Sequence, residues 1–286
     1  MRPVRRRAEA RELELRAASR APPTARRGAP IAEPLAMLVR RGLNPRLSRP
    51  DLPFNSKLPE DALVAIAARL HHYAFRLFLR GAILAPAGFL PTEATRYLAA
   101  EPARAMAEDL VTLGLAERRG GGRYRLLTRA RSFGGTLEWW MARELGARLG
   151  LAVATGVRTG ARGVGGDLDM VATAEGKLIY VELKSAPPKH LTDAEIGAFL
   201  RRVRAVRPDV TLFAMDTALR LGDRVLPMFE GALSQDRDTP PAPRRLVHDT
   251  WSLTPHVYVV SAKESLVENA CRAIAEGLRA LAPPAP

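Results

Sequence analysis

Charged side chains stand at one end of two apolar runs that a tight turn separates. The stretch 165–184 reads GGDLDMVATAEGKLIYVELK, with a Glu-Gly turn in its middle. If this turn joins two antiparallel strands, the register places Asp169 opposite Glu182. The same register places Asp167 opposite Lys184, and opposed residues have Cβ atoms about 4.5–5.5 Å apart. The sequence therefore predicts three carboxylates and one ammonium gathered at a single end of the hairpin.

Alternation along the two strands separates these charges from the apolar side chains. The apolar face is expected to carry Leu168, Met170, Ala172, Ile179, Val181 and Leu183. On the other face, a shared proton, the lysine or a divalent cation can offset the repulsion between Asp169 and Glu182. Carboxylates with water molecules are the usual ligands of Mg²⁺. We interpret the pair as a metal site; the alternative is a solvated salt-bridge cluster at a strand end.

The lysine of this group is a rare residue type in an arginine-rich chain. The sequence holds 5 Lys and 39 Arg, yet Lys184 stands beside the acids. An ammonium is a compact charge with an adjustable pKa. It therefore suits contact with a water molecule or a scissile phosphate better than a planar guanidinium does. Lys184 is thus the candidate catalytic cation.

The pattern GGDLDMVA, with Glu182 of VELK thirteen residues after Asp169, resembles the active-site hairpin of the PD-(D/E)xK, or restriction-endonuclease-like, nuclease superfamily. The stretch GTLEWWMARELGARLG is similar to the first core helix of the branch with type IV restriction enzymes and archaeal Holliday-junction resolvases. Glu138 matches the glutamate often found on that helix. The resemblance covers roughly residues 135–217. It departs from the family pattern because no proline precedes Asp169, and the final strand and helix match no subfamily.

The resemblance implies Mg²⁺-dependent hydrolysis of phosphodiester bonds, with Mn²⁺ able to replace Mg²⁺. Asp169 and Glu182 would ligate the metal together with the carbonyl oxygen of Leu183. Lys184 would orient or deprotonate the attacking water and stabilise the charge that develops on the phosphate. Glu138 would hold a second metal or its water shell.

Strands and helices that alternate along residues 132–286 must position these side chains. Apolar periodicity predicts helices over 136–150, 191–206 and 264–281, a weaker helical region to about residue 233, and strands over 151–157, 209–217 and 256–262 beside the hairpin. This alternation predicts an α/β fold. Its expected form is a restriction-endonuclease-like mixed sheet flanked by helices.

Residues 57–131 are predicted to form a second, mainly helical module. One long helix is expected over 58–84, and two shorter helices follow, ending at Gly114. A glycine-tipped hairpin then completes the order of a winged helix, in which the third helix enters the major groove and the hairpin lies along the phosphates. The candidate nucleic-acid contacts are Arg118, Arg119, Arg123 and Arg125 on the hairpin, and Arg201 and Arg204 on the helix after the motif. The alternatives are a small helical domain with a solvated hairpin, and arginines of an ordinary exposed face.

The net charge of +14 is concentrated in two segments. Residues 1–50 hold 13 Arg and 4 Glu, and residues 115–131 hold 6 Arg and 1 Glu. Clustered Lys and Arg release the counterions condensed on nucleic acid, so DNA is the expected partner. Residues 1–56, where proline recurs, are predicted to be a basic flexible tail; solubility is an equal explanation for the tail's charge.

Length, cysteine content and hydropathy restrict the class of protein. A chain of 286 residues is long enough for two domains. Its single cysteine, Cys271, cannot form an internal disulfide. No apolar run approaches the roughly 18–20 residues of a membrane-spanning helix, and no secretory signal is recognisable. We expect a cytoplasmic protein with no membrane partner.

These observations favour a Mg²⁺-dependent DNA endonuclease with a role in restriction, repair or defence, positioned on DNA by the winged-helix module. The alternative is a DNA-binding regulator or accessory protein whose nuclease-like domain is inactive. RNA stays open as a substrate because phosphate contacts do not read the sugar. A homodimer would suit an enzyme that cuts both strands, although the sequence shows no interface.

Overall fold

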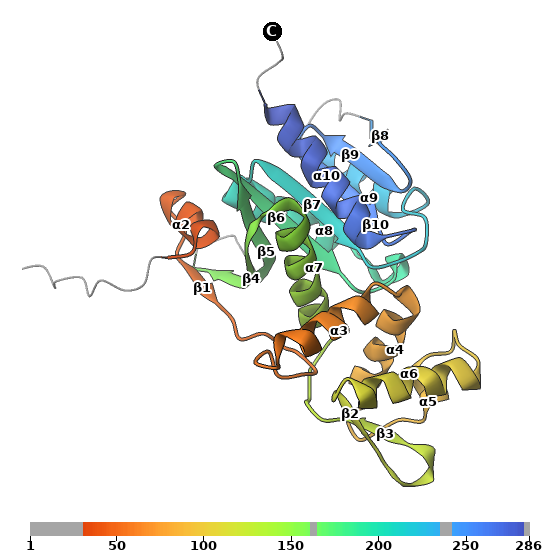
Figure 1. The fold of residues 1–286 in the computed structure, drawn as a ribbon. Coiled ribbons are helices and arrows are strands. Elements are labelled where there is room, and N and C mark those ends of the chain that lie inside the picture. Colours follow the sequence, from red (N-terminus) through yellow and green to blue (C-terminus); the bar gives the residue numbers. More distant parts are fainter. Residues whose placement is uncertain (1–30, 161–164, 235–241, 283–286) are drawn as a thin grey trace, which may run out of the picture. The chain divides into compact units, whose positions relative to one another are not determined.

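An eight-stranded mixed sheet carries the candidate site (Figure 1). The computed structural model describes residues 31–160, 165–234 and 242–282. In spatial order the strands are β1 (Pro45–Leu47), β4 (Ala152–Thr159), β5 (Asp167–Ala174), β6 (Lys177–Lys184), β7 (Val210–Met215), β10 (Val257–Ser261), β9 (Thr250–Thr254) and β8 (Arg244–Arg245). β6 and β10 run parallel to β7, and the other neighbours are antiparallel.

Helices cover both faces of this sheet (Figure 1). One face packs against α7 (Gly134–Leu149) and α10 (Leu266–Leu281), the other against α2 (Glu33–Arg40), α8 (Asp193–Val206) and α9 (Val225–Ser234). β7, between its two parallel neighbours, is buried along its whole length, as expected of a strand covered on both sides. The predicted fold class, a large mixed sheet flanked by helices, is confirmed.

The register predicted for the β5–β6 hairpin is confirmed over its ladder. Met170 pairs with Val181 and Ala172 with Ile179. The turn residues Glu175 and Gly176 have φ values of 52° and 70°. Two successive left-handed residues are typical of a type I′ turn, which matches the twist of the flanking strands.

The alternation of side chains breaks at Asp169. Met170 belongs to the apolar cluster under α7 and α10, as predicted, whereas Leu168 lies in the cluster under α8. The expectation that both share one face is therefore wrong. The neighbouring strand is irregular at the same point, where Gly156 of β4 takes a left-handed φ of 58° between the residues that pair with Met170 and Leu168.

The segment between β1 and α7 is mainly helical. It contains α3 (Glu60–Leu70), α4 (Tyr73–Leu84), α5 (Pro91–Ala94), α6 (Ala100–Thr112) and a hairpin of β2 (Ala116–Arg118) and β3 (Tyr124–Leu126) with the turn η1 (Gly120–Gly122) between them. A further bridge joins Phe89 to Tyr124. The order of helices and hairpin agrees with the sequence, and the winged-helix assignment stays a prediction. The single helix expected over 58–84 is wrong, because the chain bends by 107° between α3 and α4.

Residues 32–56 do not form part of a tail. They supply α2, which packs on β4 and β5, and the edge strand β1, whose Arg46 pairs with Arg158. The predicted tail is therefore wrong over this range, because β1 pairs with β4 and forms the edge strand of the sheet. Residues 1–30 of that prediction lie outside the described residues.

Residues 32–286 form one compact unit. A single apolar cluster runs from Phe78 of α4 through Trp140 of α7 to Met170 and Val181 of the sheet. The predicted modules 57–131 and 132–286 thus share a core, and their separate roles stay a prediction. Within the described ranges no single helix is long and apolar enough to cross a membrane; the bent pair α3–α4 meets that criterion only when its two helices are taken together.

Candidate active site

A buried carboxylate, Glu182, is the centre of the candidate site. Its side chain is 2% exposed. One oxygen, Oε1, accepts from Arg202 Nη2 at 2.7 Å and lies 3.0 Å from Lys184 Nζ. The other oxygen accepts the Tyr180 hydroxyl, which itself accepts from Arg202 Nε at 2.9 Å. Buried charges persist only when they are paired and hydrogen-bonded, and this one meets both conditions.

Lys184 lies at the end of β6 between two acids. Besides Glu182, its ammonium lies 3.5 Å from a carboxylate oxygen of Glu195 on α8. Burial opposes the charged form, but Glu182, Asp169 and Glu195 together outweigh burial and raise the pKa of Lys184 above its ordinary value. Lys184 is therefore a cation at neutral pH. It can donate hydrogen bonds and stabilise negative charge, and it cannot act as a base until it loses its proton.

Asp169 lies beside this ion pair, at the break in the β5 alternation. Its Oδ2 accepts from the backbone N–H of Leu183 at 2.7 Å, which holds it against β6. Burial, followed by repulsion from Glu182, raises the pKa of Asp169 to about 7, although the Leu183 N–H and the charge of Lys184 oppose the shift. At neutral pH its carboxyl is poised between the two protonation states.

Glu138 reaches the same acids from α7. Its carboxylate accepts a hydrogen bond from the backbone N–H of Gly156. Burial first, and then the charges of Asp169, Asp167 and Glu182, raise the pKa of Glu138 to about 8. The three predicted carboxylates and Asp167 therefore influence one another's ionisation, and their catalytic role stays a prediction.

Asp167 is held by residues other than the predicted one. Its carboxylate accepts from Arg158 Nε at 3.0 Å and from the Ser48 hydroxyl at 3.3 Å. Lys184 pairs with Glu182 and Glu195, although the predicted hairpin register places it opposite Asp167. The hydrogen-bonded ladder between β5 and β6 ends at Met170, and β4 supplies the nearer cation to Asp167.

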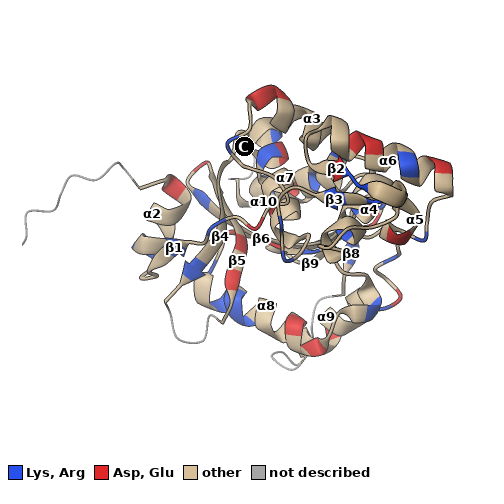
Figure 2. Cartoon of the chain, turned by 90° about the horizontal axis from the view of Figure 1, so that it is seen from below, with Lys and Arg blue, Asp and Glu red and all other residues tan. Residues whose placement is uncertain are grey.

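A pocket of about 730 Å³ opens beside Glu138 and Asp167. Ser48, Arg158 and Trp139 line it with them, on the β1 side of the sheet. Figure 2 shows the acidic positions of β5 beside basic positions on β4 and α8. Glu138 and Asp167 are thus within reach of solvent and of a polyanion that the neighbouring cations would attract.

The Mg²⁺ that the resemblance implies fits part of this donor set. Within the described ranges no three His, Cys, Asp or Glu side chains are arranged to hold a metal ion. Asp169 and Glu138 nevertheless suit a hard cation, because burial and the charges of neighbouring acids raise both pKa values and a divalent charge would favour the ionised carboxylates. Glu182 is already neutralised by two protein cations. Asp169 and Glu138 are therefore the residues that would hold a metal ion.

Arg202 and Tyr180 are the members of the site that the sequence did not reveal. A signal for Arg202 was present, since it follows the apolar positions Ile196 and Phe199 at helical spacing and precedes Val206. A charged residue on an apolar helix face predicts a buried partner, and here that partner is Glu182. Tyr180 carried no such signal, because an aromatic residue in a buried strand suffices for packing.

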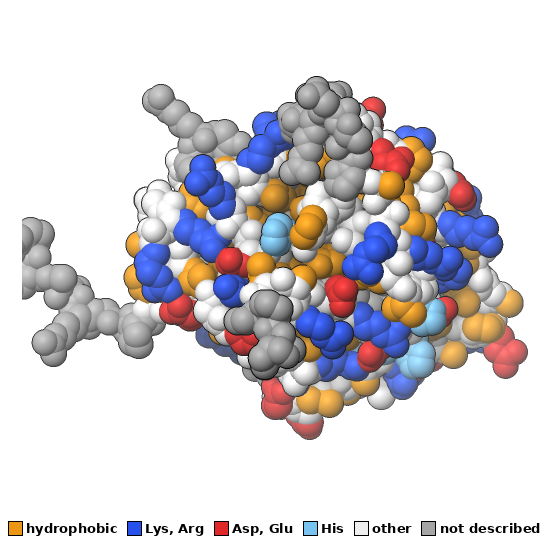
Figure 3. All heavy atoms as spheres, turned by 90° about the horizontal axis from the view of Figure 1, so that it is seen from above, with side chains coloured by type: hydrophobic (Ala, Val, Ile, Leu, Met, Phe, Trp, Pro, Cys, Tyr) orange, Lys and Arg blue, Asp and Glu red, His pale blue; other side chains and the backbone are white. Residues whose placement is uncertain are grey.

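The residues predicted to contact nucleic acid are all exposed arginines. Those on the β2–β3 hairpin pair with carboxylates. Arg118 pairs with Glu108, Arg119 and Arg125 pair with Glu117, and Arg123 pairs with Glu93. Exposed ion pairs of this kind are weak and can exchange a carboxylate for a phosphate at little cost. Arg201 and Arg204 are exposed on α8. On the face seen in Figure 3, the visible Lys and Arg side chains are scattered among apolar and acidic ones.

Comparisons with known proteins identify structures with a similar fold but no family. No family model and no curated protein matches the sequence. The fold is similar to that of protein VC1899 from Vibrio cholerae, with a TM-score of 0.51 and 13% identity over 86% of this chain and 61% of that one. A second similar structure is Can2 from Sulfobacillus thermosulfidooxidans in complex with cyclic tetra-adenylate (cA4), with a TM-score of 0.47, 16% identity and the same coverage.

This chain spans about three fifths of the length of each of those two proteins. At 13% identity the likeness to VC1899 concerns the fold alone. The chemistry of the site therefore has to be argued from its own side chains. They provide two carboxylates with raised pKa values, a third held by cations, and a charged ammonium beside it.

Proposed function

We propose that this chain is a metal-dependent nuclease that hydrolyses phosphodiester bonds, with DNA as its substrate, in the cytoplasm. The observation that carries the proposal is the meeting of Asp169 and Glu182 with Lys184 on adjacent strands, next to Glu138. Acids that repel one another beside a charged lysine suit both halves of such a reaction: holding a cation and stabilising a phosphate.

The residues of the chain have separable tasks in this mechanism. Lys184, charged at neutral pH, donates to a phosphate oxygen and stabilises the charge that develops there. Glu182 lies 3.0 Å from the ammonium, and Arg202 donates to Glu182 and holds it in place. Because its pKa lies near 7, Asp169 can accept a proton from an attacking water or act as a ligand once deprotonated.

Asp169 and Glu138 would hold the metal, with Glu182 and the carbonyl oxygen of Leu183 completing the site after Arg202 moves away. The bound cation supplies a Lewis acid that lowers the pKa of a water molecule. Mg²⁺ is the expected ion and Mn²⁺ the expected substitute, because all the side-chain donors are oxygens.

Binding of DNA is assigned to the helical module and to α8. The β2–β3 hairpin carries Arg118, Arg119, Arg123 and Arg125, and α8 carries Arg201 and Arg204. In the winged-helix interpretation α6 would enter the major groove and the hairpin would follow the phosphates. Cutting both strands would require two copies or two successive encounters.

One observation favours a second function. Glu182 is saturated by Arg202, Tyr180 and Lys184, as in a structural ion-pair network. A DNA-binding regulator with an inactive nuclease-like domain would keep that network intact. It would bind DNA in a salt-dependent way, without cleavage and without stabilisation by a divalent ion.

The deciding experiment combines plasmid nicking with thermal unfolding. Purified protein is expected to nick supercoiled plasmid with Mg²⁺ or Mn²⁺, and Mg²⁺ is expected to raise its melting temperature. Asp169→Asn and Lys184→Met should each lower the nicking rate by about 10²–10³-fold, since each removes one electrostatic group of the site. Asp169→Asn should also abolish the Mg²⁺-induced shift.

Asp223→Asn and Lys177→Met are matched controls on exposed or distant positions, and both should behave as wild type. Equal nicking by wild type and Asp169→Asn would mean a contaminating nuclease. No nicking together with no Mg²⁺ shift would favour the regulator. Labelled RNA of the same sequence, tested in parallel, separates a deoxyribonuclease from an enzyme that accepts either sugar.

A further inference from the structure

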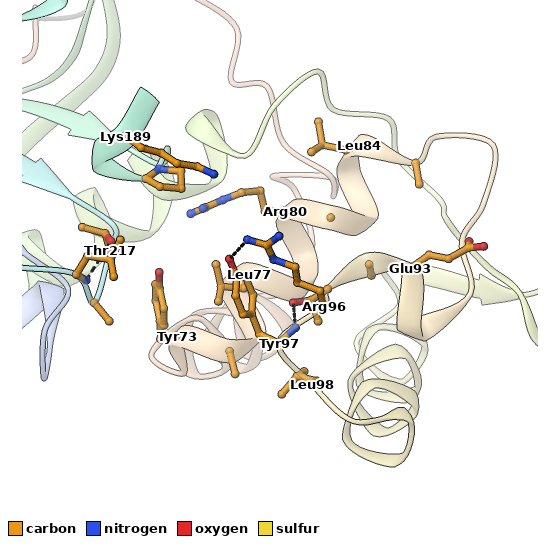
Figure 4. Close-up of a pocket in the computed structure, with 18 residues that line it drawn as sticks. Tyr73, Leu77, Arg80, Leu84, Glu93, Arg96, Tyr97, Leu98, Lys189 and Thr217 are labelled. Atoms are coloured by element: carbon orange, nitrogen blue, oxygen red, sulfur yellow. Dashed lines mark hydrogen bonds between the residues drawn. The ribbon is translucent and has the colours of Figure 1, made fainter. Parts of the chain in front are cut away.

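A second, larger pocket lies between the helical module and the sheet. Its volume is about 1010 Å³, and α4, α5 and the segments that follow β6 and β7 line it (Figure 4). Most of the lining is apolar. It belongs to neither the acids around Glu182 nor the pocket beside Glu138.

Large apolar side chains are left in solvent around this pocket. Leu84 is 73% exposed, Tyr97 63% and Leu219 58%. Single exposed apolar residues are ordinary, but three that line one hollow form a patch of the kind that marks a binding site. Figure 4 shows the Tyr97 side chain among the residues that line the pocket, and its exposure leaves ring surface accessible to a ligand.

The polar part of the lining is cationic. Arg96 stacks over Tyr97 at 5.1 Å from the ring centroid and donates to the Tyr97 hydroxyl at 3.0 Å. Lys189 is exposed, and neither of these two cations is paired with a carboxylate in the described part of the chain. Arg80 also lines the pocket, but its guanidinium is already paired through Nη2 with the buried Asp216 at 3.1 Å. Among the lining residues the one acid is Glu93, and it already accepts from Arg123.

The pocket opens at the edge of the sheet that carries the candidate site. Lys189 lies in the short segment that begins just after Lys184. Thr217 follows Asp216, whose backbone N–H donates to the Lys184 carbonyl oxygen at 2.8 Å. A chain of nucleotides bound at Lys184 would therefore have this pocket as a near neighbour along β6 and β7.

We infer that the pocket is a subsite for an unpaired nucleobase, with the adjoining phosphates on Arg96 and Lys189. A base has the flat apolar faces that suit Tyr97 and the leucines, and its strand carries the negative charge that suits the rim. A purely apolar peptide would leave these cations unused. A paired base cannot enter, so the subsite selects single-stranded or locally opened nucleic acid. This inference rests on the proposed function, because it gives the nuclease its substrate form.

The test is equilibrium binding without catalysis. Fluorescence anisotropy in EDTA compares a fluorescein-labelled oligothymidylate with a blunt duplex of the same length. Tyr97→Ala should weaken binding of the single strand about tenfold, as loss of one stacked base does, and change duplex binding less than about twofold. Lys189→Gln should weaken single-strand binding and lower its salt dependence. The matched variant Lys177→Gln, at the far end of the hairpin, should leave both unchanged.

Two binding results would each overturn the subsite: single-strand binding by Tyr97→Ala equal to wild type, or an equal loss on single strand and duplex. Sedimentation showing a dimer that Tyr97→Ala dissociates would also overturn it, since the patch would then join two copies of the chain. If Tyr97→Ala weakens single-strand binding in EDTA while the wild type cuts nothing with Mg²⁺, the subsite is supported and the proposed nuclease activity is contradicted. The nucleobase subsite and the proposed nuclease activity can therefore be contradicted independently.

Discussion

At the scale of single residues, Glu182 depends on the cations around it. Arg202 is buried on α8 and donates to both Glu182 and Tyr180. Removing one partner of a buried ion pair leaves the other charge uncompensated, which costs about 3–5 kcal/mol. Lys184 remains as a second cation here and reduces that cost.

We predict that Arg202→Met lowers the free energy of unfolding by about 2–3 kcal/mol. Arg201→Met, one position along the same helix and exposed, should change it by less than about 0.5 kcal/mol. Urea denaturation of both variants at neutral pH measures the difference. Equal stabilities of the two variants would show that Glu182 is not held by Arg202.

The raised pKa of Glu138 predicts a pH dependence of stability in metal-free buffer. Below about pH 4 the carboxyl is protonated in both the folded and the unfolded chain and costs nothing. As the pH rises toward 8, the unfolded chain loses this proton first, so stability falls. Glu138→Gln should remove part of this fall and stabilise the protein by about 2 kcal/mol at pH 8.

Thermal unfolding in EDTA between pH 5 and about 8.5 measures this slope. Glu230→Gln, an exposed acid on α9, serves as the control and should follow wild type. A Glu138→Gln curve parallel to wild type would mean that Glu138 is ionised at neutral pH without cost, and that the acids do not repel one another as described.

The sequence revealed the acids and the lysine but not all of their partners. Local pairing decided the position of Asp169 relative to Glu182, because the turn at Glu175 sets the hairpin register. The partner of Glu182 comes from α8, and the ion pair of Asp167 comes from β4. Contacts between separate elements depend on tertiary packing, which a period of two or of 3.6 residues does not encode.

At the scale of elements, the approach of α5 to α4 depends on one glycine. A Cβ atom added to Gly81 of α4 would lie 1.7 Å from the carbonyl oxygen of Ala94 at the end of α5. The backbone of α5 cannot move aside as a flexible side chain can. Gly81→Ala is therefore expected to destabilise by at least about 2 kcal/mol, although alanine is the better helix former.

Gly231→Ala on α9 is the matched control, because nothing lies within 4 Å of the added atom. It should stabilise the protein by about 0.5–1 kcal/mol, the helix-propensity difference. Urea unfolding should show changes in the free energy of unfolding that have opposite signs for the two variants. A stabilising Gly81→Ala would mean that α5 does not pack against α4 in solution.

Elements with strong periodicity were predictable and short ones were not. The ends of β6 agree with the sequence, since its apolar run is bounded by a turn and by charged residues. β1 has three residues and β8 has two, and both are strands because each pairs with a neighbouring strand. The bend between α3 and α4 falls at His71 and His72, where apolar spacing continues on both sides and hides the break.

At the scale of the whole molecule, one acid ties the helical module to the sheet. Asp216, 1% exposed at the end of β7, accepts from Arg76 Nε at 2.9 Å and from Arg80 Nη2 at 3.1 Å, both on α4. Arg76 is itself buried and lies over the Trp140 ring of α7 at 4.9 Å. Asp216→Ala should lower the free energy of unfolding by about 3–5 kcal/mol, because Arg76 keeps its charge and loses its partner.

Asp223→Ala, an exposed aspartate nearby in the sequence, should stay within about 0.5 kcal/mol of wild type. Protease accessibility gives a second measurement: with Asp216→Ala, cleavage between α3 and α5 should increase while β5 and β6 stay protected. Uniform protection in the Asp216→Ala variant would show that the apolar core alone holds the module in place.

The same aspartate connects the helical module to β6 within one residue. Its side chain receives the two arginines of α4, and its backbone N–H reaches the carbonyl oxygen of Lys184. A tilt of α4 would have to break the buried ion pair or carry Asp216 with it. Asp216 thus acts as a rigid coupling through which a displacement of α4 would reach the end of β6 where Lys184 lies.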